Sequence, residues 1–340
     1  MTASHTHSGV GALERNFVVG LIFGPYNEDL AVETADKITK AVLEAQSKLQ
    51  PCSMFAAQTA LEGVTRNRRD PSYNYDTRRF GPGYDASASK NVTDPTLSVL
   101  RLDDRTGSTV ALLFHFATHA TTLGADNMLL SADWPGVAQR IIEENFPGAV
   151  VLYMNGAEGD QAPDMGETQD DFESMETVGA RVAEGVLDVA VKARPIASTP
   201  VRSVMVRRRI PVKIRFSGIP VPDPIQESTY PPMPLMAVRV GEVAFMACPL
   251  ELICEIGLIM KQGAKGQGFK MPLVAGLANA SYAYCVTPDE YDRGGYEADA
   301  TMYGKIEAGL VIGEQMMLVR KLLRPRDGKP RSGEEEDDVQ

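Results

Sequence analysis

Apolar residues recur at helical spacing in several stretches of the chain. Asn27–Leu49 combines an apolar stripe with a charged face, and Trp134–Phe146 and Glu173–Ala193 repeat the pattern. A spacing of three to four residues places such positions on one side of a helix. We therefore expect helices in these three segments, the first of them on the surface, and a further helix over Lys305–Leu323.

Shorter apolar and β-branched runs predict strands. Leu97–Leu102 and Val110–Phe116 flank the turn signal Asp103–Gly107, so they are expected to form a hairpin. A strand at Ala149–Met154 follows the helix predicted over Trp134–Phe146, and this order indicates an α/β layer. Further strands are expected at Val201–Ile214, at Leu235–Ala247 with a turn at Gly241 and Glu242, and at Leu273–Leu277.

These elements predict an α/β fold, a single large domain with a mixed β-sheet and flanking helices over residues 1–323. Ser217–Pro234 contains six prolines and is expected to be an extended loop, because strands resume directly after it. Residues 324–340 are acidic and poor in apolar side chains, so we expect a disordered tail.

The composition excludes several classes of protein. The chain has 340 residues and a formal net charge of −11, with no basic stripe, which disfavours binding to nucleic acids and anionic membranes. No run approaches the roughly 18 apolar residues of a membrane-spanning helix, and the first residues have no signal-peptide pattern. The chain is therefore expected to be cytoplasmic. Its four cysteines form no CxxC pair and are expected to be buried free thiols.

Only four histidines are available for chemistry. His5 and His7 alternate, so in an extended segment both lie on one face. His115 and His119 stand at the end of a predicted strand, where side chains converge on sites, although His115 within the strand is expected to be structural. The distance in sequence between His5 and His119 matches no local ligand motif. From the residues alone, a metal site and exposed polar histidines both remain open.

Six blocks of sequence occur in a distinctive order. They are Thr2–Gly9, Asn67–Arg69, Phe116–His119 with Ser131–Gly136, Gly156–Pro163, Cys248–Glu251, and a longer block from Gly276 to Gly304. In combination they resemble the catalytic N-terminal domain of the neutral (non-lysosomal) ceramidases and indicate a bacterial homologue. The resemblance covers most of the chain, and its specificity comes from the combination.

The resemblance implies one zinc ion, held by two histidines, a glutamate and a tyrosine. The corresponding residues are His5, His119, Glu251 and Tyr284. Imidazole and carboxylate suit zinc, and the same donors accept manganese or iron. Without the resemblance, Glu251 also fits a charge in the first turn of a helix after Pro249, and Tyr284 fits an ordinary half-buried aromatic.

The resemblance also implies catalytic residues around the metal. His7 would steady an oxyanion or carry a proton to the leaving amine. Arg68 would orient the substrate, although a solvated arginine in a basic patch is equally consistent with the sequence, and Tyr284 would support the oxyanion. Asp160 is a candidate general base, together with Glu158 and His7.

One position departs from the family pattern. The family's Gly-Asp-x-Ser-Pro turn is Gly159–Pro163 here, and its nucleophilic serine is Ala162. A methyl group cannot form an acyl-enzyme, which leaves attack by zinc-bound water, whose pKa zinc brings to about 7. The expected function is zinc-dependent hydrolysis of an amide in a ceramide-like lipid. A zinc hydrolase of another soluble amide or ester, and a non-catalytic metal-containing binding module, are the alternatives.

The ends of the chain carry two further expectations. In the family, strands precede the His-x-His motif, whereas Met1 lies four residues before His5, so the first strands are expected to be missing. The immunoglobulin-like C-terminal domain of large ceramidases is likewise expected to be absent after Leu323. A small-molecule or lipid substrate is the expected partner, and the sequence gives no oligomeric state.

Overall fold

The computed structural model describes most of the chain. The described residues are 1–13, 15, 20, 24–70, 92–166, 170–197, 200–210, 215–216, 219–220 and 232–324. The predicted tail lies outside them except for Arg324. Most of the predicted loop Ser217–Pro234 is also outside, although its last two residues already belong to a strand. The described part is an α/β structure with mixed sheets, which confirms the predicted class.

The first sheet has five strands in the order β5-β4-β3-β1-β7. They are β1 (Ser53–Ala60), β3 (Thr96–Asp103), β4 (Thr109–Phe116), β5 (Val150–Asn155) and β7 (Arg194–Pro195). The predicted hairpin is confirmed as the antiparallel pair β3 and β4, and β5 runs parallel to β4. This sheet is therefore mixed.

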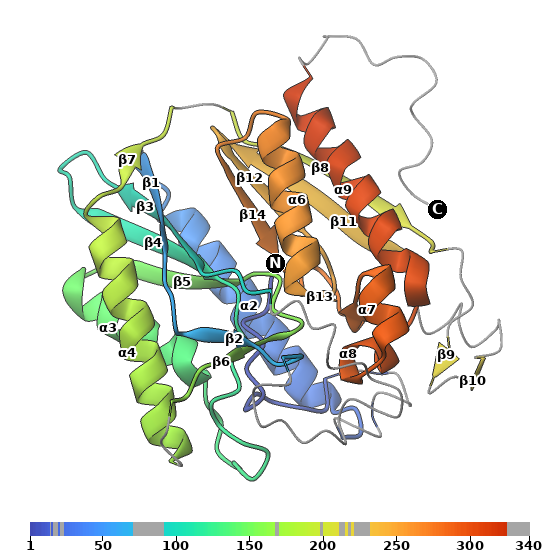
Figure 1. Ribbon diagram of the computed structural model, residues 1–340. Coiled ribbons are helices and arrows are strands. Elements are labelled where there is room, and N and C mark those ends of the chain that lie inside the picture. Colours follow the sequence, from blue (N-terminus) through green and yellow to red (C-terminus); the bar gives the residue numbers. More distant parts are fainter. Residues whose placement is uncertain are drawn as a thin grey trace.

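Helices α3 (Asp133–Asn145) and α4 (Asp171–Ala190) cover the outer face of this sheet (Figure 1). Leu97 and Val99 of β3 are buried in one cluster with Trp134 of α3, whereas Leu100 belongs to a separate cluster. Successive strand residues point to opposite faces, so β3 is buried on both sides.

The second sheet has four strands in the order β14-β12-β11-β8, and helices α6 and α9 cover its outer face (Figure 1). The elements are β8 (Arg202–Arg208), β11 (Met233–Val240), β12 (Val243–Ala247), β14 (Met271–Ala275), α6 (Cys254–Gly266) and α9 (Glu307–Leu323). The predicted hairpin turning at Gly241 is confirmed, and the positive φ of 61° at this turn suits glycine. Strand β14 is parallel to β12.

The two sheets face each other in the middle of the molecule. Ala244 and Met246 of β12 are buried with α6 and α9, whereas Val243 and Ala247 share a cluster with Leu100 of the first sheet. The order of layers is therefore helices, sheet, sheet, helices (Figure 1). The predicted mixed sheet is divided into two facing sheets, because residue alternation predicts strands without saying which strands pair.

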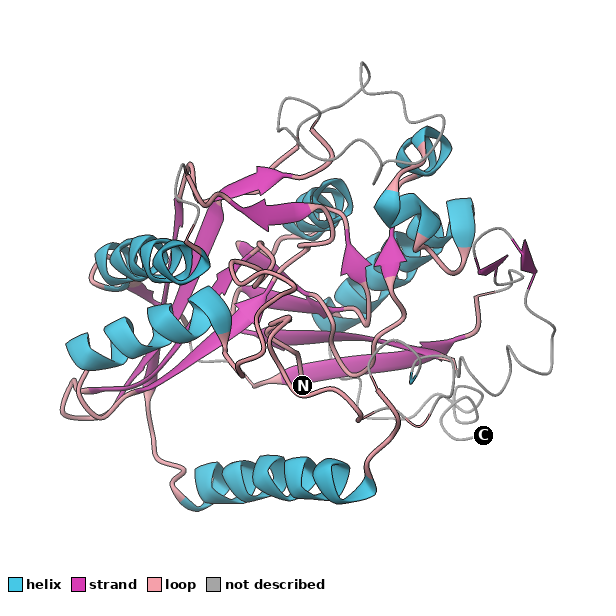
Figure 2. Ribbon diagram, turned by 90° about the horizontal axis from the view of Figure 1, so that it is seen from below, coloured by secondary structure: helices cyan, strands magenta, loops and turns pink. Residues whose placement is uncertain are grey.

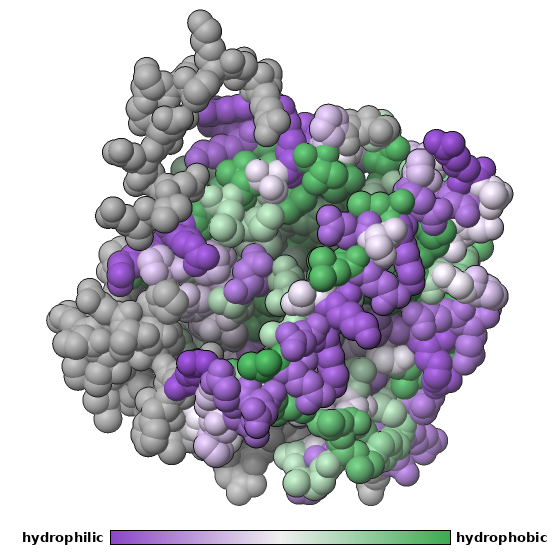
Figure 3. All heavy atoms as spheres, turned by 180° about the vertical axis from the view of Figure 1, so that it is seen from behind, coloured by the Kyte–Doolittle hydropathy of each residue, from purple (hydrophilic) through white to green (hydrophobic). Residues whose placement is uncertain are grey.

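Helix α2 (Glu28–Ser47) confirms the predicted surface helix. The side chain of Asn27 caps it by accepting a hydrogen bond from the amide of Leu30, and none of its residues is buried. It runs along one side of the layers (Figure 2). From behind, the surface mixes hydrophilic and hydrophobic residues (Figure 3). Among the helices of the described residues, none has the length and apolar character needed to cross a membrane.

Short elements complete the fold. They are β2 (Thr65–Asn67), β6 (Gln161–Pro163), β9 (Arg215–Phe216), β10 (Ile219–Pro220), β13 (Glu251–Leu252), β15 (Tyr284–Cys285), α7 (Pro288–Arg293), α8 (Tyr296–Asp299) and a 3-10 turn at Gly304–Ile306. Cys248, Cys254 and Cys285 are buried free thiols as predicted, whereas Cys52 is exposed.

Candidate metal centre

Two short parallel strands bring a glutamate and a tyrosine together. In β13 and β15, Glu251 is directly opposite Tyr284. Helix α6 begins only at Cys254. The alternative that placed Glu251 in the first turn of a helix is therefore wrong, because the residue belongs to a strand whose partner lies more than thirty residues further along the chain.

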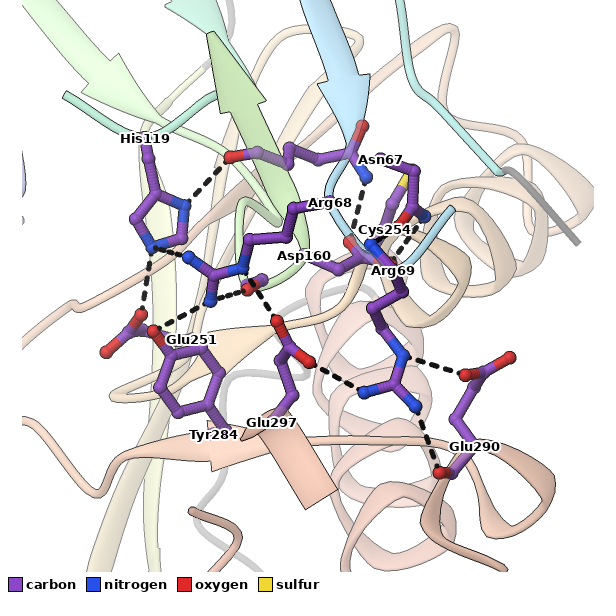
Figure 4. Close-up of polar contacts among 12 residues, drawn as sticks. Asn67, Arg68, Arg69, His119, Asp160, Glu251, Cys254, Tyr284, Glu290 and Glu297 are labelled. Carbon is purple, nitrogen blue, oxygen red and sulfur yellow. Dashed lines mark hydrogen bonds and ion pairs between the residues drawn. The ribbon is translucent and has the colours of Figure 1, made fainter. Parts of the chain in front are cut away.

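A second short pair, β2 with β6, positions the arginine and a histidine. Directly after β2, the amide of Arg68 donates to the carbonyl of Asp160 at 2.8 Å. The amide of His119 donates to the carbonyl of Gln161 at 3.0 Å. Residues of this turn and strand thereby hold Arg68 and His119 side by side, as Figure 4 shows.

The N-terminal segment brings in the remaining histidines. Thr2 and Thr6 form isolated bridges with Ala278 and Ala120. Between them, His5 has a φ of 62°, so the expectation of a fully extended segment is wrong. The rings still converge, with 3.3 Å between the Nε2 atoms of His5 and His7. The left-handed turn at His5, rather than strand alternation, accompanies this convergence.

Two imidazoles meet one carboxylate oxygen. Glu251 Oε2 lies 3.1 Å from His5 Nε2 and 3.3 Å from His119 Nε2. Zinc bonds of about 2.0–2.1 Å at tetrahedral angles place ligand atoms roughly 3.3 Å apart. His119 Nδ1 donates to the carbonyl of Gln161 at 2.8 Å, which leaves the lone pair of Nε2 directed at Glu251. These donors fit a zinc ion.

Protonation at neutral pH also suits metal binding. Burial, and after it the neighbouring Arg68, lowers the pKa of His119 to about 4. Burial alone would raise the pKa of Glu251, but the close contacts with His119 and His5 outweigh it and hold this pKa well below its usual value. A neutral imidazole and an ionised carboxylate are the forms that ligate metals.

Arg68 connects the fourth predicted ligand to the centre. Its Nη2 donates to the Tyr284 hydroxyl at 3.0 Å and to the Gly159 carbonyl at 2.7 Å, and its Nε donates to Glu297 at 2.6 Å (Figure 4). The side chain is only 12% exposed, so the solvated-arginine alternative is wrong. Burial raises the pKa of Tyr284 by more than Arg68 lowers it, which keeps the phenol protonated.

Asp160 is buried among donors. Its carboxylate accepts hydrogen bonds from the side chains of Asn67 and Gln161 and from the amide of Cys254, each at 2.8 Å. Burial raises its pKa to about 6 against these bonds. The contacts join β2, β6 and the start of α6, as Figure 4 shows for Asn67 and Cys254, and they favour a positioning role over that of a base.

His7 is exposed at a cavity of about 620 Å³ beside the centre. Arg68, Tyr284 and Glu297 line the same cavity. The expected proton donor and substrate-orienting residue therefore share a space of the size that small-molecule ligands occupy. Ala162 is buried in β6, opposite Arg66.

Glu297 was not predicted as a site residue. It accepts from Arg68 and, at 2.6 Å, from Arg69, which also donates to Glu290 at 2.8 Å (Figure 4). Its only signal in the sequence is its place within the long block Gly276–Gly304. The pairing could not be anticipated, because it depends on the packing of α8 against the loop after β2.

Comparison with known proteins also finds similarity to the neutral ceramidases. Residues 1–152 match the family model for the N-terminal part of neutral/alkaline non-lysosomal ceramidases. Neutral ceramidase B of Dictyostelium discoideum is 22% identical over 95% of this chain and 60% of its own length. The neutral ceramidases of Pseudomonas aeruginosa and Mycobacterium tuberculosis are 21% and 22% identical over 89% and 97% of this chain. They are covered over 56% and 64% of their lengths.

The fold is shared with solved structures as well. The crystal structure of neutral ceramidase from Pseudomonas aeruginosa has a TM-score of 0.79 at 20% identity, covering 94% of this chain and 60% of the other. A ceramidase complexed with C2 has a TM-score of 0.80 at 20% identity, covering 94% and 61%. The chain thus spans about three fifths of the length of these relatives. The resemblance to the neutral ceramidase family is confirmed.

Proposed function

Because the chain is a relative of the neutral ceramidases, we propose that it is a zinc-dependent hydrolase of amide bonds, with ceramide-like N-acyl lipids as its first substrate class. The observation that carries the proposal is the approach of His5 Nε2 and His119 Nε2 to one oxygen of Glu251, at 3.1 and 3.3 Å. These residues and Tyr284 would hold one zinc ion, and residues 1–323 would form the catalytic unit. When bound, zinc supplies Lewis-acid polarisation of the carbonyl and lowers the pKa of a coordinated water.

The chain's own groups supply positioning and proton transfer. Arg68 orients the hydroxyl of Tyr284, which would support the oxyanion that develops on the substrate carbonyl. His7, at the cavity, takes a proton from the attacking water and delivers it to the leaving amine. Water is the proposed nucleophile, since Ala162 has no hydroxyl group to form an acyl-enzyme.

Substrate class rests on the relatives and the cavity. The matched relatives are ceramidases by name, and one related structure is described as complexed with C2. The cavity next to His7 is lined by the charged Arg68 and Glu297 and by the hydroxyl-bearing Tyr296. Such groups suit the hydroxyl and amide groups of a polar headgroup.

The direct test is hydrolysis of a panel of N-acyl substrates by the zinc-loaded protein. We expect release of the amine from long-chain ceramides, and a drop in kcat/KM of at least about 100-fold in His119→Ala. Glu176→Gln, on the exposed surface of α4, is the control and keeps the wild-type rate. Hydrolysis of only short soluble amides or esters identifies the wrong substrate class, and an unchanged rate in His119→Ala contradicts the metal-dependent mechanism.

Ala162 specifically favours one competing function, a metal-containing binding module without turnover. Ala162→Ser separates the two. If the wild-type chain is inactive and the serine alone creates activity, the chain lost a nucleophile and the hydrolase proposal fails. An active wild-type chain refutes the binding module.

A further inference from the structure

Glu158 is a buried acid that the proposed centre does not use. It lies on the turn between β5 and β6, and its exposed fraction is 0%. Neither of its carboxylate oxygens has a hydrogen-bond partner among the described residues. Buried carboxylates are normally paired with a cation or with donors, because their desolvation is otherwise uncompensated.

The carboxylate points into the metal centre. One of its oxygens, a nitrogen of His5 and an oxygen of Glu251 all lie within 4.8 Å of one another. The backbone at Gly276 closes the opposite side, since a Cβ atom there would lie 2.7 Å from Glu158 Oε2 and 2.4 Å from the carbonyl of Gly156. Glycine at this position therefore leaves space for the carboxylate beside His5 and Glu251.

The groups around Glu158 supply too little positive charge to balance its carboxylate, and a divalent cation would supply it. Its acidic neighbours Glu251 and Asp160 repel its ionised form. Arg68 attracts it, but the guanidinium of Arg68 already donates to Glu297, Tyr284 and a backbone carbonyl. A cation between Glu158 and Glu251 would offset two negative charges at once.

We propose that Glu158 is a further ligand of the metal ion, adding a second carboxylate to His5, His119, Glu251 and Tyr284. This proposal rests on the proposed metal centre and extends it. Zinc accepts carboxylate oxygens and reaches five ligands, so a coordinated water would take the position of the Tyr284 phenol when Glu158 is bound. The centre then binds its cation through two carboxylates instead of one.

Zinc affinity of the whole chain tests the proposal, measured by competition with a chelator for the wild type and Glu158→Gln. The neutral amide is a poor zinc ligand of the same size, so we expect affinity to fall at least about 10-fold. The visible spectrum of the cobalt-substituted protein is expected to change as well, because it reports the ligand set directly.

Glu307→Gln is the matched control. Glu307 is also a glutamate with an exposed fraction of 0%, but it belongs to α9. Among the described residues, the groups that could hold a metal ion are His5 with His7 and His119, and His5 with Glu158 and Glu251, and Glu307 is in neither. The substitution replaces a buried carboxyl group without touching the centre. Its zinc affinity and cobalt spectrum should equal those of the wild type.

Thermal unfolding distinguishes ligation from a purely structural role. Metal-free Glu158→Gln is expected to be at least as stable as the metal-free wild type, because a buried acid beside Glu251 and Asp160 is gone, and zinc should raise its Tm less. Wild-type zinc affinity with an unchanged cobalt spectrum in Glu158→Gln overturns the proposal while leaving the proposed function intact. If Glu158→Gln fails to fold, Glu158→Asp is the second variant, since it keeps the carboxyl group on a shorter side chain. Zinc affinity equal to that of the wild type in Glu158→Asp would overturn the proposal in the same way. A wild-type chain that binds no zinc overturns both.

Discussion

Arg68 joins three parts of the site through one planar group. Its guanidinium donates to Glu297, to the hydroxyl of Tyr284 and to the carbonyl of Gly159. Lysine carries a single ammonium group and cannot hold three acceptors in this fixed geometry. The orientation of the Tyr284 phenol therefore depends on arginine at this position.

Arg68→Lys is expected to lower the free energy of unfolding by about 1–3 kcal/mol, because lysine leaves some of the buried acceptors around Glu297 without a donor. The control is Arg140→Lys, whose pair with Glu176 has side chains 52% and 56% exposed and should contribute less than about 1 kcal/mol. Urea unfolding of the metal-free proteins measures both. Equal losses of unfolding free energy in the two variants would show that burial of the Arg68 pair does not add to stability.

For single residues, the sequence blocks identified those that converge in the site but not their partners. His5, His119, Glu251 and Tyr284 could be selected because each lies in a block with matching neighbours. Their roles as ligands remain predictions. Glu297 could not be selected, since an acid becomes part of a site only when another element brings an arginine to it.

The turn between β5 and β6 is packed against β13. The amide of Gly159 donates to the carbonyl of Leu252 at 2.8 Å, and a Cβ atom at Gly159 would lie 2.6 Å from the carbonyl oxygen of Glu251. Both neighbours are backbone atoms, which cannot rotate away. Glycine is thus required for the strand that carries Glu251 to approach this turn.

Gly159→Ala is expected to destabilise the protein by about 1–3 kcal/mol and to weaken zinc binding, because β13 must move. Gly313→Ala is the control, since no atom lies within 4 Å of a Cβ at this position in α9. It should be neutral or stabilise the helix by up to about 1 kcal/mol. Thermal unfolding and zinc titration of both variants check this, and a Gly159→Ala protein with wild-type zinc affinity would show that β13 does not depend on the close approach.

Strand β4 contacts the second sheet through His115, as a structural histidine. Its Nε2 donates to the carbonyl of Val274 in β14 at 2.8 Å. Burial, followed by the charge of Lys261, lowers its pKa to about 4 from an ordinary value of 6.5. Between these two pH values the unfolded chain binds the proton more readily, so stability falls as the pH falls.

Metal-free wild-type protein should therefore lose about 2 kcal/mol between pH 7 and pH 4.5 through His115, at about 1.4 kcal/mol per pKa unit. In His115→Gln, which retains a side-chain donor, this part of the loss should disappear. Urea unfolding at the two pH values gives the comparison. Identical losses in both proteins would mean that His115 is not the group responsible.

Elements with strong periodicity could be predicted, and short paired ones could not. The helices α2, α3 and α4 occur where amphipathic spacing predicted them. Strand β1 was missed, because alanines supply much of its apolar content. Strand β13 has two residues and exists through its pairing with β15, so no local pattern marks it.

The candidate centre lies where the two halves of the molecule meet. His119 follows the last strand of the β3 and β4 hairpin, whereas Glu251 follows the β11 and β12 hairpin of the second sheet. The α/β class and mixed pairing could be predicted from the order of elements. The two facing sheets could not, since they are set by contacts between distant residues such as Leu100 and Val243.

A metal ion bound by both halves would stabilise the whole chain. Free zinc at 100 times its Kd should add about 2.7 kcal/mol to the free energy of unfolding, and a chelator should reverse the gain. The most direct measurement is elemental analysis of the purified protein beside His5→Ala and His119→Ala. One zinc per chain, lost in both variants, is the predicted result. No bound metal in the wild type, even after incubation with zinc, would contradict the account.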